Sequence, residues 1–180
     1  DDWPRTGDYV TECQMQMFRR VCAAALVAWL SGCTGTTTVQ DNHPLIASAN
    51  AVESAKVYFI RPDPGFRGVM DMPVTISLGG SEMLGLAKGQ YTLLSLKPGR
   101  AEMKVESYTV VGTSNTMTPV STTSQLTLSS GVTQYLVFEL VPRGALAGSV
   151  FVPREVSREH ALEAARGLSP VGLAAREPLQ

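Results

Sequence analysis

Few side chains in this sequence could carry out covalent chemistry, and the three cysteines are the first to consider. Cys13 and Cys22 precede Cys33, and no cysteine follows it. A chain cut at Cys33 would keep a single thiol and could form no internal disulfide. The thiol of Cys33 therefore calls for another explanation, and a thiolate is a ready nucleophile for modification.

The segment before Cys33 has the pattern of a secretory signal peptide. A short basic stretch, residues 17–20, leads into the apolar run of residues 21–30. A spanning helix needs about 20 apolar residues, so this run is too short to cross a membrane. Residues 1–16 are acidic where a basic start is expected. They are either upstream sequence, with Met17 or Met15 as the true start, or a real N-terminal extension.

The residues Leu30-Ser31-Gly32-Cys33 resemble the lipobox of bacterial lipoproteins, in which an aliphatic residue and two small residues precede the cysteine. The resemblance implies a diacylglyceryl group on the sulfur of Cys33 and cleavage just before it. Two or three acyl chains, at about 0.8 kcal/mol per buried methylene, form a stable anchor. Thr34 stands where an aspartate would retain a lipoprotein in the inner membrane. The family's sorting rule thus implies the outer membrane, with the folded part in the periplasm.

Other candidates for chemistry are weak. His43 has only Asp41 as a ligand-type neighbour, whereas a metal site needs three or four ligands. His160 and Glu163 lie one turn apart in an expected helix and are better explained as surface residues. Asp63 and Asp71 could form a pair of carboxylates like that of glycosidases. Aspartates in such positions are more often turn residues. We expect no enzyme, no cofactor and no metal.

Composition supports one domain of ordinary size that binds no nucleic acid. The chain has 180 residues, of which 44% are hydrophobic and 17% charged. Of its charged residues, 12 basic and 12 acidic ones follow Cys33, so the folded part has no basic surface for phosphates. The frequent Gly, Pro, Ser and Thr favour strands and turns. We expect a small, mostly β fold, an antiparallel β-sandwich with one C-terminal helix.

Short alternating runs separated by turns predict the strands. Gly79-Gly80-Ser81 predicts a hairpin turn, since no phosphate-binding glycine motif accompanies it. Ser157 as N-cap and Gly167 as stop predict a helix over residues 156–168. Polar composition predicts a long loop from Gly112 to Ser124. The expected strands are 56–61, 73–78, 82–86, 90–96, 101–106, 125–128 and 133–140.

Three of these segments together resemble a bacterial lipoprotein-associated family, the domain of unknown function DUF2846. They are Ala55–Pro62 with its Val-Tyr-Phe-Ile-Arg-Pro, the stretch from Gln90-Tyr91 to Pro98-Gly99, and Gly131–Leu140. Arg100-Ala101 departs from the family pattern, which has a polar residue and a histidine there. The resemblance implies a small β-sandwich on a lipid anchor and brings no activity with it. The expected division is residues 1–16 upstream or extension, 17–32 signal peptide, 33–54 tether, 55–168 β domain and 169–180 flexible tail.

Two functions from different classes follow from these expectations. One is an interaction or structural module that meets an envelope protein through a sheet edge or the Gly112–Ser124 loop. The other is a binder of small ligands or glycans that uses aromatic side chains. A row of exposed aromatics on one sheet face would favour the second function, and its absence would favour the first. The candidate aromatics are Tyr58, Phe59, Tyr91 and Tyr135.

Overall fold

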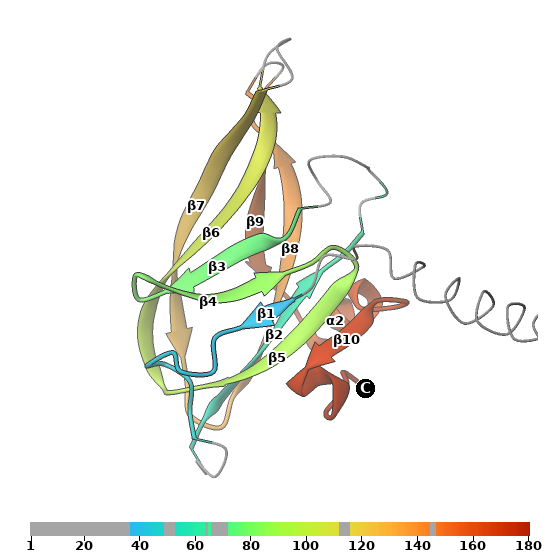
Figure 1. The fold of residues 1–180 in the computed structure, drawn as a ribbon. Helices are drawn as coiled ribbons and strands as arrows, with labels where there is room; N and C mark the ends of the chain where they lie inside the picture. The colour runs from blue at the N-terminus through green and yellow to red at the C-terminus, as the bar shows by residue number, and fades with distance from the viewer. Residues whose placement is uncertain (1–36, 49–52, 64, 66–71, 112–115, 145–146) are drawn as a thin grey trace, which may run out of the picture. The chain divides into compact units, whose positions relative to one another are not determined.

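A computed structural model describes residues 37–48, 53–63, 65, 72–111, 116–144 and 147–180 (Figure 1). The expected signal peptide and Cys33 lie outside the described residues. Ten strands form two five-stranded sheets in this part of the chain. Sheet A has the order β1 (Thr38–Val39), β4 (Ser81–Leu86), β3 (Val74–Leu78), β6 (Gly99–Val111) and β7 (Thr116–Leu128). Sheet B has the order β10 (Ser169–Gly172), β5 (Gln90–Leu96), β2 (Ala55–Arg61), β8 (Thr133–Pro142) and β9 (Ser149–Glu155).

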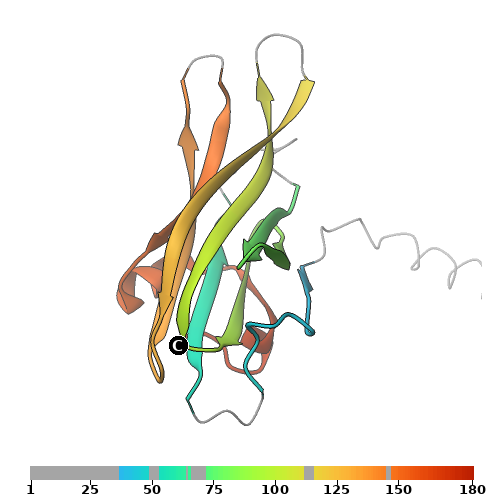
Figure 2. The same ribbon diagram turned by 90° about the vertical axis from the view of Figure 1, so that its left-hand side faces the viewer.

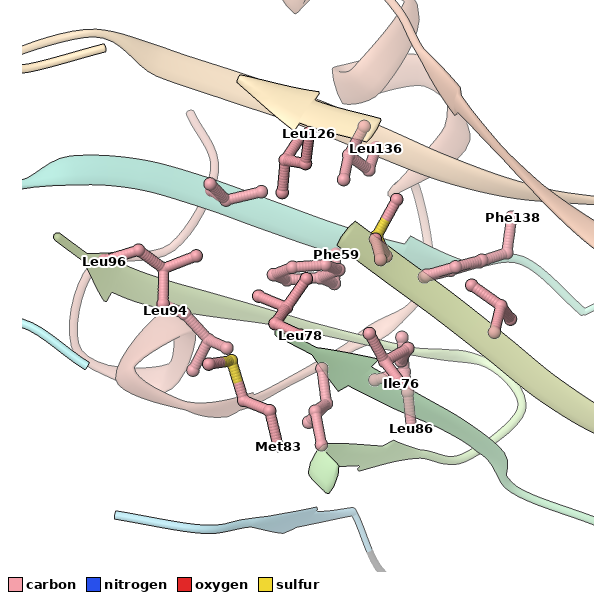
Figure 3. Packing of buried hydrophobic residues seen from close by; sticks show 14 of the residues in the cluster. Phe59, Ile76, Leu78, Met83, Leu86, Leu94, Leu96, Leu126, Leu136 and Phe138 are labelled. Carbon is pink, nitrogen blue, oxygen red and sulfur yellow. The ribbon is translucent and has the colours of Figure 1, made fainter. Parts of the chain in front are cut away.

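The two sheets face each other across one apolar core, to which both contribute alternate residues (Figure 3). Phe59 of β2 lies at its centre and stacks on Phe138 of β8, with 6.3 Å between ring centroids. Both side chains are at most 2% exposed. Burying a side chain of this size contributes about 1.5–3 kcal/mol, so this layer accounts for much of the stability.

A second apolar cluster covers the outer face of sheet B. Alternate residues of β2 and β5 point away from the first core, among them Tyr58 and Tyr91. They pack against α2 (Arg158–Ala164) and the residues after it, including Ala161 and Ala174, which are fully buried. In Figure 1, α2 and β10 accordingly lie beside β2 and β5.

The mostly β fold with one helix is confirmed for the described residues. The expected strands at residues 56–61, 73–78, 82–86, 90–96 and 133–140 all occur, and β6 extends beyond the expected 101–106. Gly79 and Gly80 form the expected turn with φ values of 60° and 84°, which favour glycine. Ser157 caps α2 as expected, and the helix itself is shorter than 156–168. The expected antiparallel arrangement holds in sheet A only, because β2 pairs with β8 and β10 with β5 in parallel.

The long loop expected from Gly112 to Ser124 is wrong for most of its length. Residues from Thr116 onward form β7, which pairs with β6 at every position from Thr116 to Leu128. Serine and threonine are common in loops, but threonine is β-branched and suits a strand that has a partner. Pro119 is tolerated because β7 is an edge strand and needs no hydrogen bond on its open side. Residues 112–115 lie outside the described residues.

The segment expected as a flexible tail, residues 169–180, joins the fold. Residues Ser169–Gly172 form β10 and pair with the first half of β5. The short 3-10 helix η2 (Leu173–Ala175) follows and places Ala174 in the second apolar cluster. Pro170 marked this segment as irregular, yet proline is compatible with an edge strand.

The middle of the expected tether, residues 37–48, also packs on the sheets. Val39 pairs with Leu84 of β4, and the amide of Ala47 donates to the carbonyl of Ser95 at 2.9 Å. Leu45 and Ile46 pack against the core between the sheets. The single Val39 and the short run Leu45-Ile46-Ala47 stand among polar residues, so the sequence shows no strand pattern here.

The hairpins β6–β7 and β8–β9 extend together beyond the rest of the sheets (Figures 1 and 2). The side chain of Thr109 on β6 accepts a hydrogen bond from the amide of Ser149 at 3.0 Å. A Cβ on Gly148 would lie 2.3 Å from Thr109 Oγ1, so only glycine allows this approach. The two hairpins therefore support each other away from the main core.

Candidate functional site

His43, a weak metal candidate in the sequence, has a structural role. Its side chain is 6% exposed and lies beside the β3–β4 turn. The amide of Leu45 donates to Nδ1 at 3.2 Å, and Nε2 is 3.1 Å from the carbonyl of Leu78 and 3.3 Å from that of Ser81. This pattern fits a neutral ring with its proton on Nε2. The ring thus attaches residues 43–45 to sheet A.

The other polar candidates are dispersed. Asp63 accepts a hydrogen bond from the amide of Gly65 at 2.7 Å and lies 3.2 Å from the ammonium of Lys88, as a turn residue would. His160 and Glu163 are both exposed on α2. Asp71 lies outside the described residues. Over the described ranges no group of three His, Cys, Asp or Glu side chains is arranged to hold a metal ion.

Arg61 is a buried charged residue that is not among the candidates from the sequence. Its side chain is fully buried at the end of β2. Nη1 donates to the carbonyl of Leu86 at 2.8 Å, and the guanidinium carbon lies 4.9 Å from the ring centroid of Phe151, a cation–π contact. Val57 and Phe59 face the core, so the alternation of β2 already places Arg61 inward. The side chain connects β2, β4 and β9 within the core.

The candidate aromatics are used for packing. Phe59 belongs to the core between the sheets, and Tyr58 stacks on Tyr135 at 5.6 Å between centroids under the C-terminal segment. Tyr91 is 5% exposed in the same cluster. These four side chains therefore form no exposed aromatic row.

Tyr58 also takes part in a polar contact that holds the C-terminus. Its hydroxyl donates to the carbonyl of Glu177 at 3.0 Å, and Lys56 pairs with the Glu177 carboxylate at 2.6 Å. Burial raises the pKa of the Tyr58 hydroxyl, and the hydrogen bond with Glu177 raises the pKa of Lys56. Both shifts favour the neutral phenol and the charged ammonium that the contact needs.

A groove of about 650 Å³ lies where two segments meet on the outer edge of β5. Residues 45–47 bond to the end of β5, and β10 pairs with its beginning. The lining of the groove between them combines apolar residues, among them Ile46 and Leu173, with charged ones. Its charged lining residues are Asp41, Arg176 and Glu177.

The outward face of the β6–β7 hairpin changes character along its length. Near the base its side chains are polar and charged, as in the cross-strand pair Glu102 and Gln125. Toward the far end the pairs are Tyr108 with Pro119 and Val110 with Met117. Tyr108 is 42% exposed and Met117 45%. We call these four residues, Tyr108, Val110, Met117 and Pro119, the distal patch.

Comparison with known proteins gives no relative. No protein-family model, no curated protein and no solved structure matches this chain. The resemblance to DUF2846 therefore rests on the three sequence segments alone. In the described part of the chain, no helix is long and apolar enough to span a bilayer.

The distal patch and the groove both escaped prediction, for different reasons. The patch depends on the pairing of β6 with β7, and the polar composition of β7 predicts a loop. The alternation of Met117, Pro119 and Ser121 is the one signal of a strand there. The groove is formed by residues far apart in sequence, from Val39 to Glu177. A pattern within one short segment therefore cannot predict such a site.

Proposed function

We propose that this chain is a bacterial lipoprotein precursor whose β-sandwich acts as an interaction module rather than an enzyme. Lipid on Cys33 would hold it at the outer membrane, with the sandwich in the periplasm. The order of basic stretch, apolar run and Leu-Ser-Gly-Cys supports the anchor. The family resemblance to DUF2846 agrees with a lipid-anchored β-sandwich.

The observation that carries the interaction proposal is the distal patch. Two apolar cross-strand pairs stand on the open face of a hairpin whose remaining outward side chains are polar. Scattered apolar residues on a surface are normal, whereas a contiguous group at a projecting end is typical of a contact site. Tyr108 suits such a role, because tyrosine offers a large apolar body and a polar tip. We infer that an envelope protein binds there.

Labelled fatty acid tests the anchor in cells that express the full chain. We expect the parent chain to incorporate label, and the Cys33→Ala chain to incorporate none and to remain uncleaved. Cys22→Ala is the matched control and should label like the parent. Absence of label from the parent would remove the anchor from the proposal.

Photo-crosslinking in the intact envelope tests the contact. A photoreactive amino acid replaces Tyr108 in one strain and the exposed Gln125, at the base of the same face, in another. We expect a defined protein adduct from position 108 that is absent from position 125. Equal adducts at both positions, or none, would argue against the patch as a contact site.

A second candidate function is the binding of a small ligand, and the groove beside β5 favours it. Its volume of about 650 Å³ lies within the range of small-molecule sites, and its lining combines apolar and polar residues. Leu173→Trp would fill the groove from an exposed position. Loss of a ligand that copurifies with the parent chain, without loss of the adduct at position 108, would assign binding to the groove.

A further inference from the structure

Strand β7 forms an unusually long free edge. It has 13 residues and is the last strand of sheet A, with β6 as its only ladder partner among the described strands. Its register with β6 is continuous, whereas the β3–β4 ladder shifts between Ile76 and Ser77. The side chains of β7 are exposed or half-buried except Leu126 and Leu128. Its outward side chains are exposed, whereas the inward Thr122 donates a hydrogen bond to the carbonyl of Phe151 on β9 at 2.8 Å.

The other three sheet edges carry features that discourage strand addition. Strand β1 has only 2 residues, and β10 has 4 and contains Pro170. Strand β9 contains Pro153 and the charged residues Arg154 and Glu155. Short length, proline and charge are the usual means by which proteins protect their edges.

Strand β7 has almost none of this protection. Its sequence, TMTPVSTTSQLTL, contains no charged residue, and it has Pro119 alone as an interrupting residue, toward the distal end. Threonine and valine favour extended backbone. Free backbone donors and acceptors on such a strand are a template for a further strand. An edge of this kind persists in a folded protein when a partner covers it.

We propose that the partner is β7 of a second copy of this chain, aligned antiparallel around a two-fold axis near the middle of the strand. In such a contact the strand pairs with the same strand of the other copy. A charged residue near the axis would therefore lie opposite the same charge and be repelled by it. An uncharged strand avoids this penalty, and serine and threonine pairs across it form favourable contacts. The two copies of sheet A would then form one continuous sheet. The dimer does not depend on the lipid anchor or on the distal patch.

Cysteine crosslinking locates the contact in the full chain. Ser121 and Thr123 are exposed and lie near the middle of β7, and Thr127 is exposed near its end. In a background with Cys13→Ser and Cys22→Ser, we expect a disulfide-linked homodimer from Ser121→Cys or Thr123→Cys under mild oxidant. Thr127→Cys and the background itself should give none.

A charge substitution measures the strength of the contact. Thr123→Lys places two like charges close to the axis and should raise the dimer dissociation constant roughly tenfold. Thr127→Lys adds the same charge away from the axis and should leave the constant near that of the parent. Sedimentation of the full chain in detergent gives the constant, and circular dichroism verifies that the variants are folded.

Three results would overturn the proposal. The parent chain could stay monomeric at all concentrations, with no crosslink from the central positions. Oligomers that grow with concentration would indicate an open-ended contact between β7 and another edge such as β9. A crosslink from Thr123→Cys to a different envelope protein, without a homodimer, would assign the edge to that protein.

Discussion

The two sheets of this sandwich differ in what covers their outer faces. Sheet B is covered on both sides: the core lies on one face, and α2 with the residues after it lies on the other. Sheet A has the core on one face only, and its outer face along β6 and β7 is open. Sheet B is therefore buried on both faces, whereas the two surfaces proposed for protein contacts, the distal patch and the edge of β7, belong to sheet A. The predictions below test this division.

Removal of residues 169–180 should have the largest effect. The truncation deletes β10 and uncovers Tyr91 and Leu93 in the second cluster. We expect the free energy of unfolding to fall by about 3 kcal/mol or more, from the apolar area exposed. Urea denaturation measures the change. Glu163→Ala, an exposed change on α2, is the control, and an unchanged midpoint after truncation would mean that the segment does not cover sheet B.

His43→Ala should cause the next largest loss of stability. The change leaves the carbonyls of Leu78 and Ser81 without the imidazole donor and removes the acceptor for the Leu45 amide. We expect a loss of about 2 kcal/mol, since buried polar groups lose their partners. His160→Ala, on the exposed face of α2, should change stability by less than about 0.5 kcal/mol. Equal effects of the two changes would contradict the structural role of His43.

Alkaline pH should weaken the contact between Tyr58 and the C-terminus. The pKa of Tyr58 is raised above its ordinary value of 10.0 by burial, and that of Lys56 above 10.5 by Glu177. Groups with a raised pKa stabilise the fold below the ordinary value and lose this contribution as pH rises through the folded value. The parent should therefore lose stability above about pH 10, with the exposed Lys56 pair contributing little of it.

The variant Tyr58→Phe isolates this effect. At about pH 8 it should be less stable than the parent by about 1 kcal/mol, because one hydrogen bond is lost. The difference should shrink at a second pH well above 10.0, because the tyrosine then ionises in the unfolded chain and the parent loses stability that the variant does not have. Urea midpoints at the two pH values give the comparison, and a difference that stays constant would contradict a role for the Tyr58 proton.

Tyr108→Ser should have the smallest effect on stability. The side chain is 42% exposed on the open face of sheet A, so we expect a change within about 0.5 kcal/mol. Binding of the envelope partner should nevertheless fall, as measured by recovery of the partner with the full chain. The conservative change Tyr108→Phe should retain most of the binding. A marked loss of stability would show that this residue belongs to the core.

Strands with clear alternation or turns were predictable from the sequence, and those that depend on a distant partner were not. Strands β2, β3 and β5 were foreseen because Val57, Ile76 and their neighbours alternate with a buried face. Strand β10 is stable only because β5 lies beside it, and nothing in residues 169–172 indicates that neighbour. Strand β7 was hidden by its serine and threonine content, which suits loops and edge strands equally.

The candidate site was less predictable than the fold. His43 looked isolated because its partners, the carbonyls of Leu78 and Ser81, are more than 30 residues away and are backbone groups. The exposed distal patch arises from a cross-strand register, which single-strand patterns do not reveal. Cys33 is the opposite case, since its proposed role rests on a local motif that the described residues leave untested.

The docking of β1 on β4 fixes how far the sandwich could move from a membrane. Thr38 is only five residues after Cys33, which is a reach of roughly 17 Å for extended chain. With lipid on Cys33, as proposed, the sandwich would be confined to a thin layer against the bilayer instead of ranging over the roughly 70 Å that a free tether to residue 54 would allow. Molecules held in one such layer meet by lateral diffusion in a plane, so a weak contact between them can be populated at modest copy number.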